Sequence, residues 1–190
     1  MELEVVLRES EQLMREGNFE AAIELLQELL AEEPENLHAL RHLGVAFTES
    51  GRNREAINTI QFYLKMDTQN AQAYEAIGCA HLRLDEYKEA EEYLGRAKEL
   101  EPENPTILRN LSVLYSQTAK PEESLKLLER SYEINPEDYL TQYAISSAYL
   151  YYGRREEAKQ ILWDILQSDV PEEIRKPCED RYLHLSVDWL

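Results

Sequence analysis

Two histidines and one cysteine are the side chains in this sequence best suited to bind a metal ion. His38 and His42 are four residues apart, so on a helix both imidazoles would share one face. Cys79 is expected on the same surface, further along the chain. Glu does not follow His38, so the helical metalloprotease pattern is absent, and no second pair of ligands is evident. We therefore predict ordinary surface roles for these side chains, with no metal and no cofactor.

Carboxylates are abundant, but their pattern is that of a solvated surface. Many are adjacent in sequence, as in the pairs Glu32–Glu33, Glu91–Glu92 and Glu122–Glu123. General acid–base catalysis needs two carboxylates held in one cleft with separated pKa values, whereas adjacent glutamates on a helix point in different directions. The sequence also lacks a glycine-rich phosphate loop, a nucleophile elbow and zinc-ligand spacing. It therefore predicts a protein that is not an enzyme.

Charge and cysteine content limit the partners and the compartment. The 190 residues include 38 acidic and 20 basic side chains, a net charge of −18. Nucleic acids and anionic membrane surfaces would be repelled, and no apolar run is long enough to insert into a membrane. The N-terminus lacks a signal-peptide pattern, and Cys79 and Cys178 do not form a disulfide framework. We expect a cytoplasmic protein; a salt-adapted host would be an alternative source of the acidity.

One pattern recurs every 34 residues along the chain. Acidic, helix-ending runs close at Pro34, Pro102 and Pro136, and proline ends a helix because it cannot continue the hydrogen-bond ladder. Two amphipathic segments lie between these points, and each has a small residue at a fixed position: Ser10, Gly44, Gly78, Ser112 and Ser146 in the first, and Ala22, Ala56, Ala90, Ser124 and Ala158 in the second. Small residues at both positions predict two closely packed helices.

The turn between the two predicted helices carries a residue suited to left-handed backbone. In register, these residues are Gly17, Gly51, Asp85, Ala119 and Gly153. Glycine reaches positive φ without steric cost and commonly ends a helix in this way. Because one helix pair cannot bury both of its faces, the pairs must stack on one another.

At these residues the chain resembles the tetratricopeptide repeat family. The repeat at 71–104 matches best, through Tyr74, Gly78, Ala90, Tyr93, Ala97 and Pro102. The resemblance implies an all-α, right-handed superhelical solenoid of helix-turn-helix repeats, forming one domain over residues 1–190. The predicted repeats are 3–36, 37–70, 71–104, 105–138 and 139–172, followed by a capping helix in 173–190. His81 stands where the family usually has a large aromatic residue, so we expect it in the core with a satisfied ring nitrogen.

The resemblance further implies that the first helices line a concave, partner-binding groove. Five arginines and several glutamates fall at groove positions, which predicts an inner surface close to neutral and an acidic exterior. The predicted binding residues are Arg8, Arg41, His42, Val45, Cys79, Arg83, Arg109, Asn110, Val113, Tyr143 and Tyr151. We predict a scaffold that binds a peptide segment of another protein, with apolar side chains and acidic or polar groups meeting the arginines.

Two alternative functions use the same architecture. A dedicated chaperone for an aggregation-prone client would use the groove, and a self-assembling subunit would use the terminal helix faces. The last helix bears on the second alternative: it is expected to begin at Pro177 and to run from about Cys178 to Trp189. Its apolar stripes fit a cap over the last repeat, which we favour, or a docking helix for a partner or a weak homo-oligomer.

Overall fold

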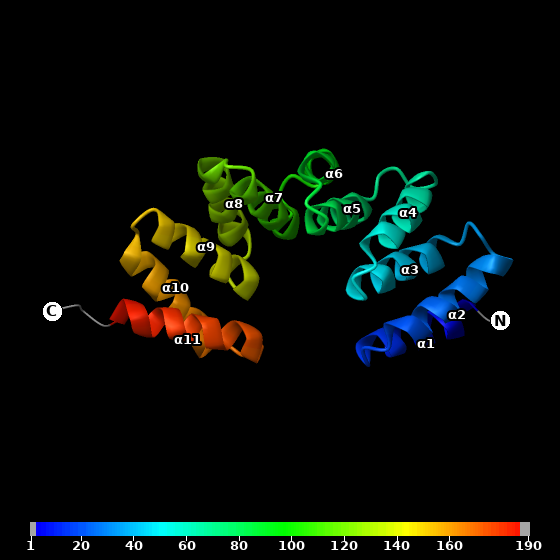
Figure 1. The fold of residues 1–190 in the computed structure, drawn as a ribbon, viewed down its shortest axis with the longest axis horizontal. Helices are drawn as coiled ribbons and strands as arrows, with labels where there is room; N and C mark the ends of the chain where they lie inside the picture. Colours follow the sequence, from blue (N-terminus) through cyan, green and yellow to red (C-terminus); the bar gives the residue numbers. More distant parts are fainter. Residues whose placement is uncertain (1–2, 187–190) are drawn as a thin grey trace. The chain divides into compact units, whose positions relative to one another are not determined.

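The computed structural model describes residues 3–186, and all regular secondary structure in that range is α-helical (Figure 1). The described residues form eleven helices: α1 (Leu3–Arg15), α2 (Phe19–Glu32), α3 (Leu37–Glu49), α4 (Asn53–Leu64), α5 (Ala71–Arg83), α6 (Tyr87–Leu100), α7 (Pro105–Gln117), α8 (Pro121–Ile134), α9 (Tyr139–Tyr151), α10 (Arg155–Gln167) and α11 (Glu172–Ser186). The first ten helices form five pairs, one in each predicted repeat, so the predicted all-α repeat fold is confirmed.

The chain divides into two compact units. The first ends at Pro102 and contains α1 to α6, whereas the second begins at Glu103 and contains α7 to α11. Each unit is described separately below. The continuity of a single array across Pro102 stays a prediction.

In the last four repeats, an asparagine or aspartate caps the start of the first helix. Asn36 Oδ1 accepts a hydrogen bond from the Ala39 amide at 3.1 Å, and Asn70 Oδ1 accepts one from the Ala73 amide at 2.9 Å. Asn104 and Asp138 cap α7 and α9 in the same way. Each side chain satisfies an amide that has no partner within its helix, so the polar residue after each acidic run fixes where the next repeat begins.

The turns within the repeats all pass through left-handed backbone. Gly17, Gly51 and Gly153 have φ values of 75°, 77° and 75°, and the equivalent Asp85 and Ala119 have φ values of 58° and 56°. At each turn the amide that follows this residue bonds back to the first helix, as Arg52 N does to Phe47 O at 2.8 Å. This is the Schellman geometry, and it confirms the predicted role of the turn position.

Small residues let the two helices of a repeat approach closely. A Cβ atom added to Gly44 would lie 2.6 Å from Ile60 Cγ1, and one added to Gly78 would lie 2.6 Å from Leu94 Cγ. Ala90 of the facing helix is fully buried. The repeated small positions therefore exist because no larger side chain fits there without moving the neighbouring helix.

The last helix differs from its prediction in where it begins. It starts at Glu172 rather than at Pro177, which lies inside it. Pro177 is the sixth residue of the helix, so its missing N–H removes one intrahelical hydrogen bond. Pro171 stands immediately before the helix, and its carbonyl accepts a hydrogen bond from Ile174 N in the first turn at 2.9 Å. Val187 to Leu190, including the predicted end of this helix at Trp189, lie outside the described residues.

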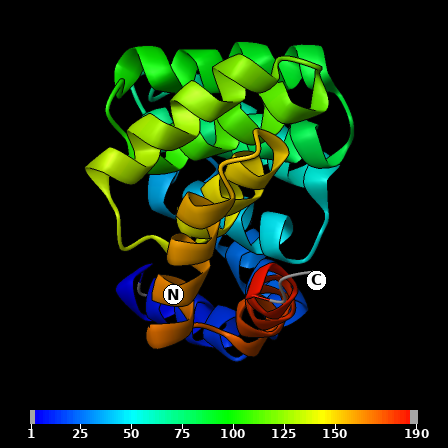
Figure 2. The same ribbon diagram turned by 90° about the vertical axis from the view of Figure 1, so that its left-hand side faces the viewer.

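Helix α11 takes the place of the first helix of a further repeat. It follows α9 by one repeat length and packs beside α10, as Figures 1 and 2 show, burying Cys178 and Leu185. At the position where the other first helices have Gly or Ser it has Asp180, which forms an ion pair with Lys176 at 3.3 Å. Both side chains are exposed, so a charged pair stands where a further second helix would pack, in keeping with the cap that the sequence favours.

Candidate functional site

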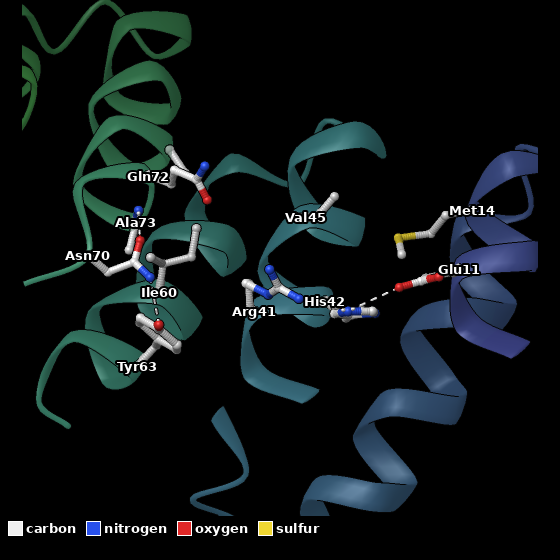
Figure 3. A pocket seen from close by; sticks show the side chains of 11 residues that line it. Glu11, Met14, Arg41, His42, Val45, Ile60, Tyr63, Asn70, Gln72 and Ala73 are labelled. Atoms are coloured by element: carbon white, nitrogen blue, oxygen red, sulfur yellow. Dashed lines mark hydrogen bonds and ion pairs between the residues drawn. The ribbon is translucent and has the colours of Figure 1, made fainter. Parts of the chain in front are cut away.

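A hollow of about 320 Å³ opens among α1, α3, α4 and α5 of the first unit. We call it the Arg41 pocket; Figure 3 shows its side chains. It is lined by Glu11, Met14, Arg41, His42, Val45, Ile60, Tyr63, Asn70, Gln72, Ala73 and Ala76. Most of this wall is apolar; Arg41 lies beside His42, and Tyr63 and Asn70 lie on the opposite wall. The pocket can therefore take an apolar side chain beside a group that bonds to a guanidinium.

The guanidinium of Arg41 is the uncompensated charge of this pocket. Arg41 is exposed, and its Nη2 lies 3.4 Å from His42 Nε2. Among residues 3–186, no carboxylate forms an ion pair with Arg41. The nearby carboxylate of Glu11 lies instead 3.5 Å from His42 Nε2. A guanidinium without a carboxylate partner, beside apolar surface, is suited to accept one from a ligand.

His42 forms the buried end of the pocket and is only 7% exposed. Its Nδ1 lies 3.4 Å from Ser10 Oγ, and that hydroxyl donates to Leu7 O at 2.8 Å. Burial, and then the nearby Arg41 charge, lower the pKa of His42 below its ordinary value of 6.5. The imidazole is therefore neutral at pH 7, and Nε2 can accept a hydrogen bond from Arg41.

The opposite wall is held by a chain of hydrogen bonds. Asn70 Nδ2 donates to the Tyr63 hydroxyl at 2.8 Å, and that hydroxyl donates to Asp67 Oδ2 at 2.7 Å (Figure 3 draws the first bond). Burial and the Asp67 carboxylate raise the pKa of Tyr63. Sequence reasoning placed groove residues only on first helices, so it missed Tyr63 on α4 and Asn70 at the start of α5. The one available signal was Asn70, which recurs as a cap at the repeat boundary.

A second, separate hollow of about 590 Å³ opens among α7, α8 and α9 of the second unit. We call it the Tyr151 pocket. It is lined by Ser112, Val113, Ser116, Ala119, Pro121, Ser124, Leu128, Ala144, Ser147, Ala148, Tyr151 and Tyr152. The two tyrosine rings meet edge to face with centroids 5.1 Å apart. Small side chains make the walls, so the space between these helices stays open.

Comparisons with known proteins identify the repeats. Three family models described as tetratricopeptide repeat match residues 13–78, 71–104 and 106–135. The chain belongs to the tetratricopeptide repeat family. Members of this family are in general non-enzymatic scaffolds for protein interaction, and the fold of this chain indicates the same kind of scaffold. No curated protein matches the chain.

Several solved structures share the fold. A thermophilic repeat protein of Thermus thermophilus has a TM-score of 0.81 at 18% identity, covering 95% of this chain and 98% of that one. MamA has a TM-score of 0.69 at 24% identity, covering 90% and 96%. YrrB, described as having an unusual peptide-binding site, has a TM-score of 0.63 at 18% identity, covering 92% and 90%.

Five of the predicted binding residues lie in the two pockets of this tetratricopeptide repeat protein. Arg41, His42 and Val45 come together in the first pocket, and Val113 and Tyr151 lie in the second. The other six are outside both pockets: Arg8, Cys79, Arg83, Arg109, Asn110 and Tyr143. Arg8 is exposed on α1, Cys79 and Asn110 are half-buried, and Arg83 Nη1 donates to Thr48 O at 3.3 Å.

Arg109 and Tyr143 are tied into the repeat structure. The Arg109 side chain is 15% exposed and forms an ion pair with Asp138, which also caps α9. The guanidinium of Arg181 in α11 lies 4.6 Å from the centre of the Tyr143 ring. Substituting either residue would therefore disturb the packing between repeats as well as any surface it offers a partner.

His38 and His81 lie in different surroundings. His38 is exposed whereas His42 is buried, and the described residues contain no group of three potential metal ligands. His81 lies in the core, as expected: its Nδ1 is 2.7 Å from Glu86 Oε2, and its ring stacks on Tyr93 at 5.4 Å. None of the helices in 3–186 is long and apolar enough to span a membrane.

Proposed function

We propose that the chain is a scaffold that binds a segment of a partner protein in the Arg41 pocket. The observation that carries the proposal is the guanidinium of Arg41, which has no carboxylate partner among the described residues and borders an apolar hollow. The segment would place an apolar side chain in the hollow and an aspartate or glutamate against Arg41. Hydrogen bonds between charged groups are about twice as strong as neutral ones.

The distribution of charge supports an acidic segment at this position. The first helices of the five repeats carry five arginines and five glutamates, whereas acidic residues outnumber basic ones two to one in the second helices. An acidic segment would be repelled by the second helices and accepted on the first. Such complementarity affects the choice of partner and its orientation more than the total affinity.

The likeness to YrrB adds a precedent within the fold. That protein is described as having an unusual peptide-binding site. For the present chain, peptide binding in the Arg41 pocket remains our proposal, and it assigns no catalytic step to any residue. We also propose a cytoplasmic setting, with which the absence of a disulfide at Cys79 and Cys178 is compatible.

The proposal can be tested with short synthetic peptides and fluorescence anisotropy. One set pairs a central Leu with Asp, and the matched set replaces that Asp by Asn. We expect the Asp peptides to bind more tightly, and Arg41→Gln to weaken them by about tenfold or more, the scale of a lost charged hydrogen bond. Arg8→Gln is the matched control, because Arg8 is exposed on α1 outside the pocket. Equal binding of the Asp and Asn peptides would show that the pocket does not select a carboxylate.

A further inference from the structure

Small side chains and two tyrosines give the Tyr151 pocket its form. Ala144, Ser147 and Ala148 of α9 line it together with Ser112 and Ser116 of α7. At about 590 Å³ it has room for the largest side chain. Tyr151 is 75% exposed and Tyr152 is 38% exposed, so two aromatic rings are available to a ligand. The walls therefore favour a large, flat, mostly apolar side chain.

The four serine hydroxyls in these walls each donate a hydrogen bond to a backbone carbonyl. Ser112 Oγ donates to Arg109 O at 2.6 Å, and Ser116 Oγ donates to Val113 O at 2.7 Å. The other two wall serines do the same: Ser124 Oγ donates to Ser112 O at 2.8 Å, and Ser147 Oγ donates to Tyr143 O at 3.0 Å. A hydroxyl that donates to a carbonyl still offers acceptor lone pairs. The walls therefore match a ligand group that donates a hydrogen bond and does not need to accept one.

Carboxylates surround one end of this pocket. Glu122 and Glu123 directly follow Pro121, which lines the pocket, and lie in the first turn of α8. Partial burial, and then the charge of Glu122, raise the pKa of Tyr152, in agreement with this placement. Neither glutamate forms an ion pair with another described residue. The cation of Arg181 stands at Ser147, to which it donates a hydrogen bond. The end of the pocket at Tyr152 is thus the negative end, and it favours a basic group on the ligand.

We propose that the Tyr151 pocket binds a tryptophan side chain of a partner protein, with a lysine or arginine next to it in the partner's sequence. Indole is the aromatic side chain that donates a hydrogen bond and accepts none, which matches the serine lone pairs. The adjacent cation meets Glu122 and Glu123 beside Tyr152. This site shares no residue with the Arg41 pocket and takes a segment of opposite charge, so it stands independently of the function proposed above.

The test uses capped Gly/Ser peptides with a central Lys-Trp-Lys, followed by ¹H–¹⁵N NMR titration of the full chain. We expect shifts at the amides of Ala144, Ala148 and Ser116. Lys-Trp-Lys should bind about fivefold more tightly than Lys-Phe-Lys, the scale of one neutral hydrogen bond. It should also bind more tightly than Glu-Trp-Glu. Equal affinity for tryptophan and phenylalanine, or shifts confined to other parts of the chain, would overturn the proposal.

Variants of the protein separate this site from the Arg41 pocket. Ser116 is exposed at the rim, so Ser116→Leu should fill the pocket and keep the fold, which circular dichroism checks. Binding of Lys-Trp-Lys to this variant should fall at least tenfold. Exchanging Glu122 and Glu123 together for Gln should remove the preference for lysine over glutamate beside tryptophan. Arg41→Gln should leave all of these affinities unchanged. Undiminished binding by the folded Ser116→Leu variant would overturn the proposal.

Discussion

Gly78 sets the distance between α5 and α6. A Cβ atom there would lie 2.6 Å from Leu94 Cγ and 3.1 Å from the Leu94 backbone nitrogen. Because the backbone cannot move aside as a flexible side-chain end can, Gly78→Ala should destabilise the protein by about 1–3 kcal/mol, the usual cost of overpacking. Urea unfolding followed by circular dichroism measures this change.

Gly95 provides the matched control for that substitution. It lies within α6, and an added Cβ atom would meet nothing within 4 Å. Gly95→Ala should therefore stabilise the protein by up to about 1 kcal/mol, because alanine favours a helix interior. If both substitutions changed stability in the same direction, close packing at Gly78 would not be the cause.

Ala119 holds a left-handed backbone conformation that alanine disfavours. Its φ is 56°, whereas glycines occupy three of the equivalent turns. Left-handed backbone costs roughly 1–2 kcal/mol for a residue with a Cβ atom, offset in part by the greater freedom of glycine in the unfolded chain. Ala119→Gly should therefore raise the free energy of unfolding by about 1 kcal/mol or less. Gly153→Ala should lower it, and thermal denaturation of both variants measures the two shifts.

His42 makes the stability of the first unit depend on pH. Its folded-state pKa lies below the unfolded value of 6.5, so the unfolded chain binds the proton more readily. Stability should fall as the pH drops below about 6.5, and this loss should level off below the folded pKa. His42→Gln should remove that part of the pH dependence. Urea unfolding of both proteins between pH 8 and pH 5 tests this; parallel curves would contradict it.

At the scale of helices, the opening of α11 can be followed through the reactivity of the Cys178 thiol. Cys178 is fully buried and burial raises its pKa, whereas Cys79 is half-buried. Iodoacetamide should therefore label Cys79 before Cys178, because the reagent needs an exposed thiolate. Arg155 Nη2 donates to Leu185 O at 3.0 Å, so Arg155→Ala should speed labelling of Cys178 by loosening α11. Peptide mass spectrometry resolves the two rates; Lys126→Ala, on α8, is the control.

The helix pairs could be predicted from the sequence, whereas the start of α11 could not. Local rules predict the helix pairs well, because the small, turn and proline positions recur in register and each acts within its own repeat. Pro177 misled the prediction of α11 because proline at the start of a helix and proline in its second turn look alike in sequence. Pro171, the true start signal, stands only six residues earlier.

For the molecule as a whole, the candidate sites were harder to predict than the fold. Arg41, His42 and Val45 were expected together, but Tyr63 and Asn70 enter the same pocket from outside the first helices. Arg109 has the residue type of a binding group, yet Asp138 holds it as part of the repeat. A pocket is what packing leaves unfilled, so it depends on side chains from several helices at once and follows no single periodicity.

The uneven division of charge between first and second helices has a practical consequence. The second helices carry two acidic residues for each basic one, and the first helices of the five repeats are balanced. The imbalance is greatest in α2, which carries four glutamates and no basic residue, so on a positively charged sensor chip or resin the first unit should adsorb through α2. The Arg41 pocket is lined by α1, α3, α4 and α5 and by no residue of α2, so it would then stay accessible to dissolved peptides. Immobilisation by simple ion exchange would thus present this pocket for binding measurements without a tag.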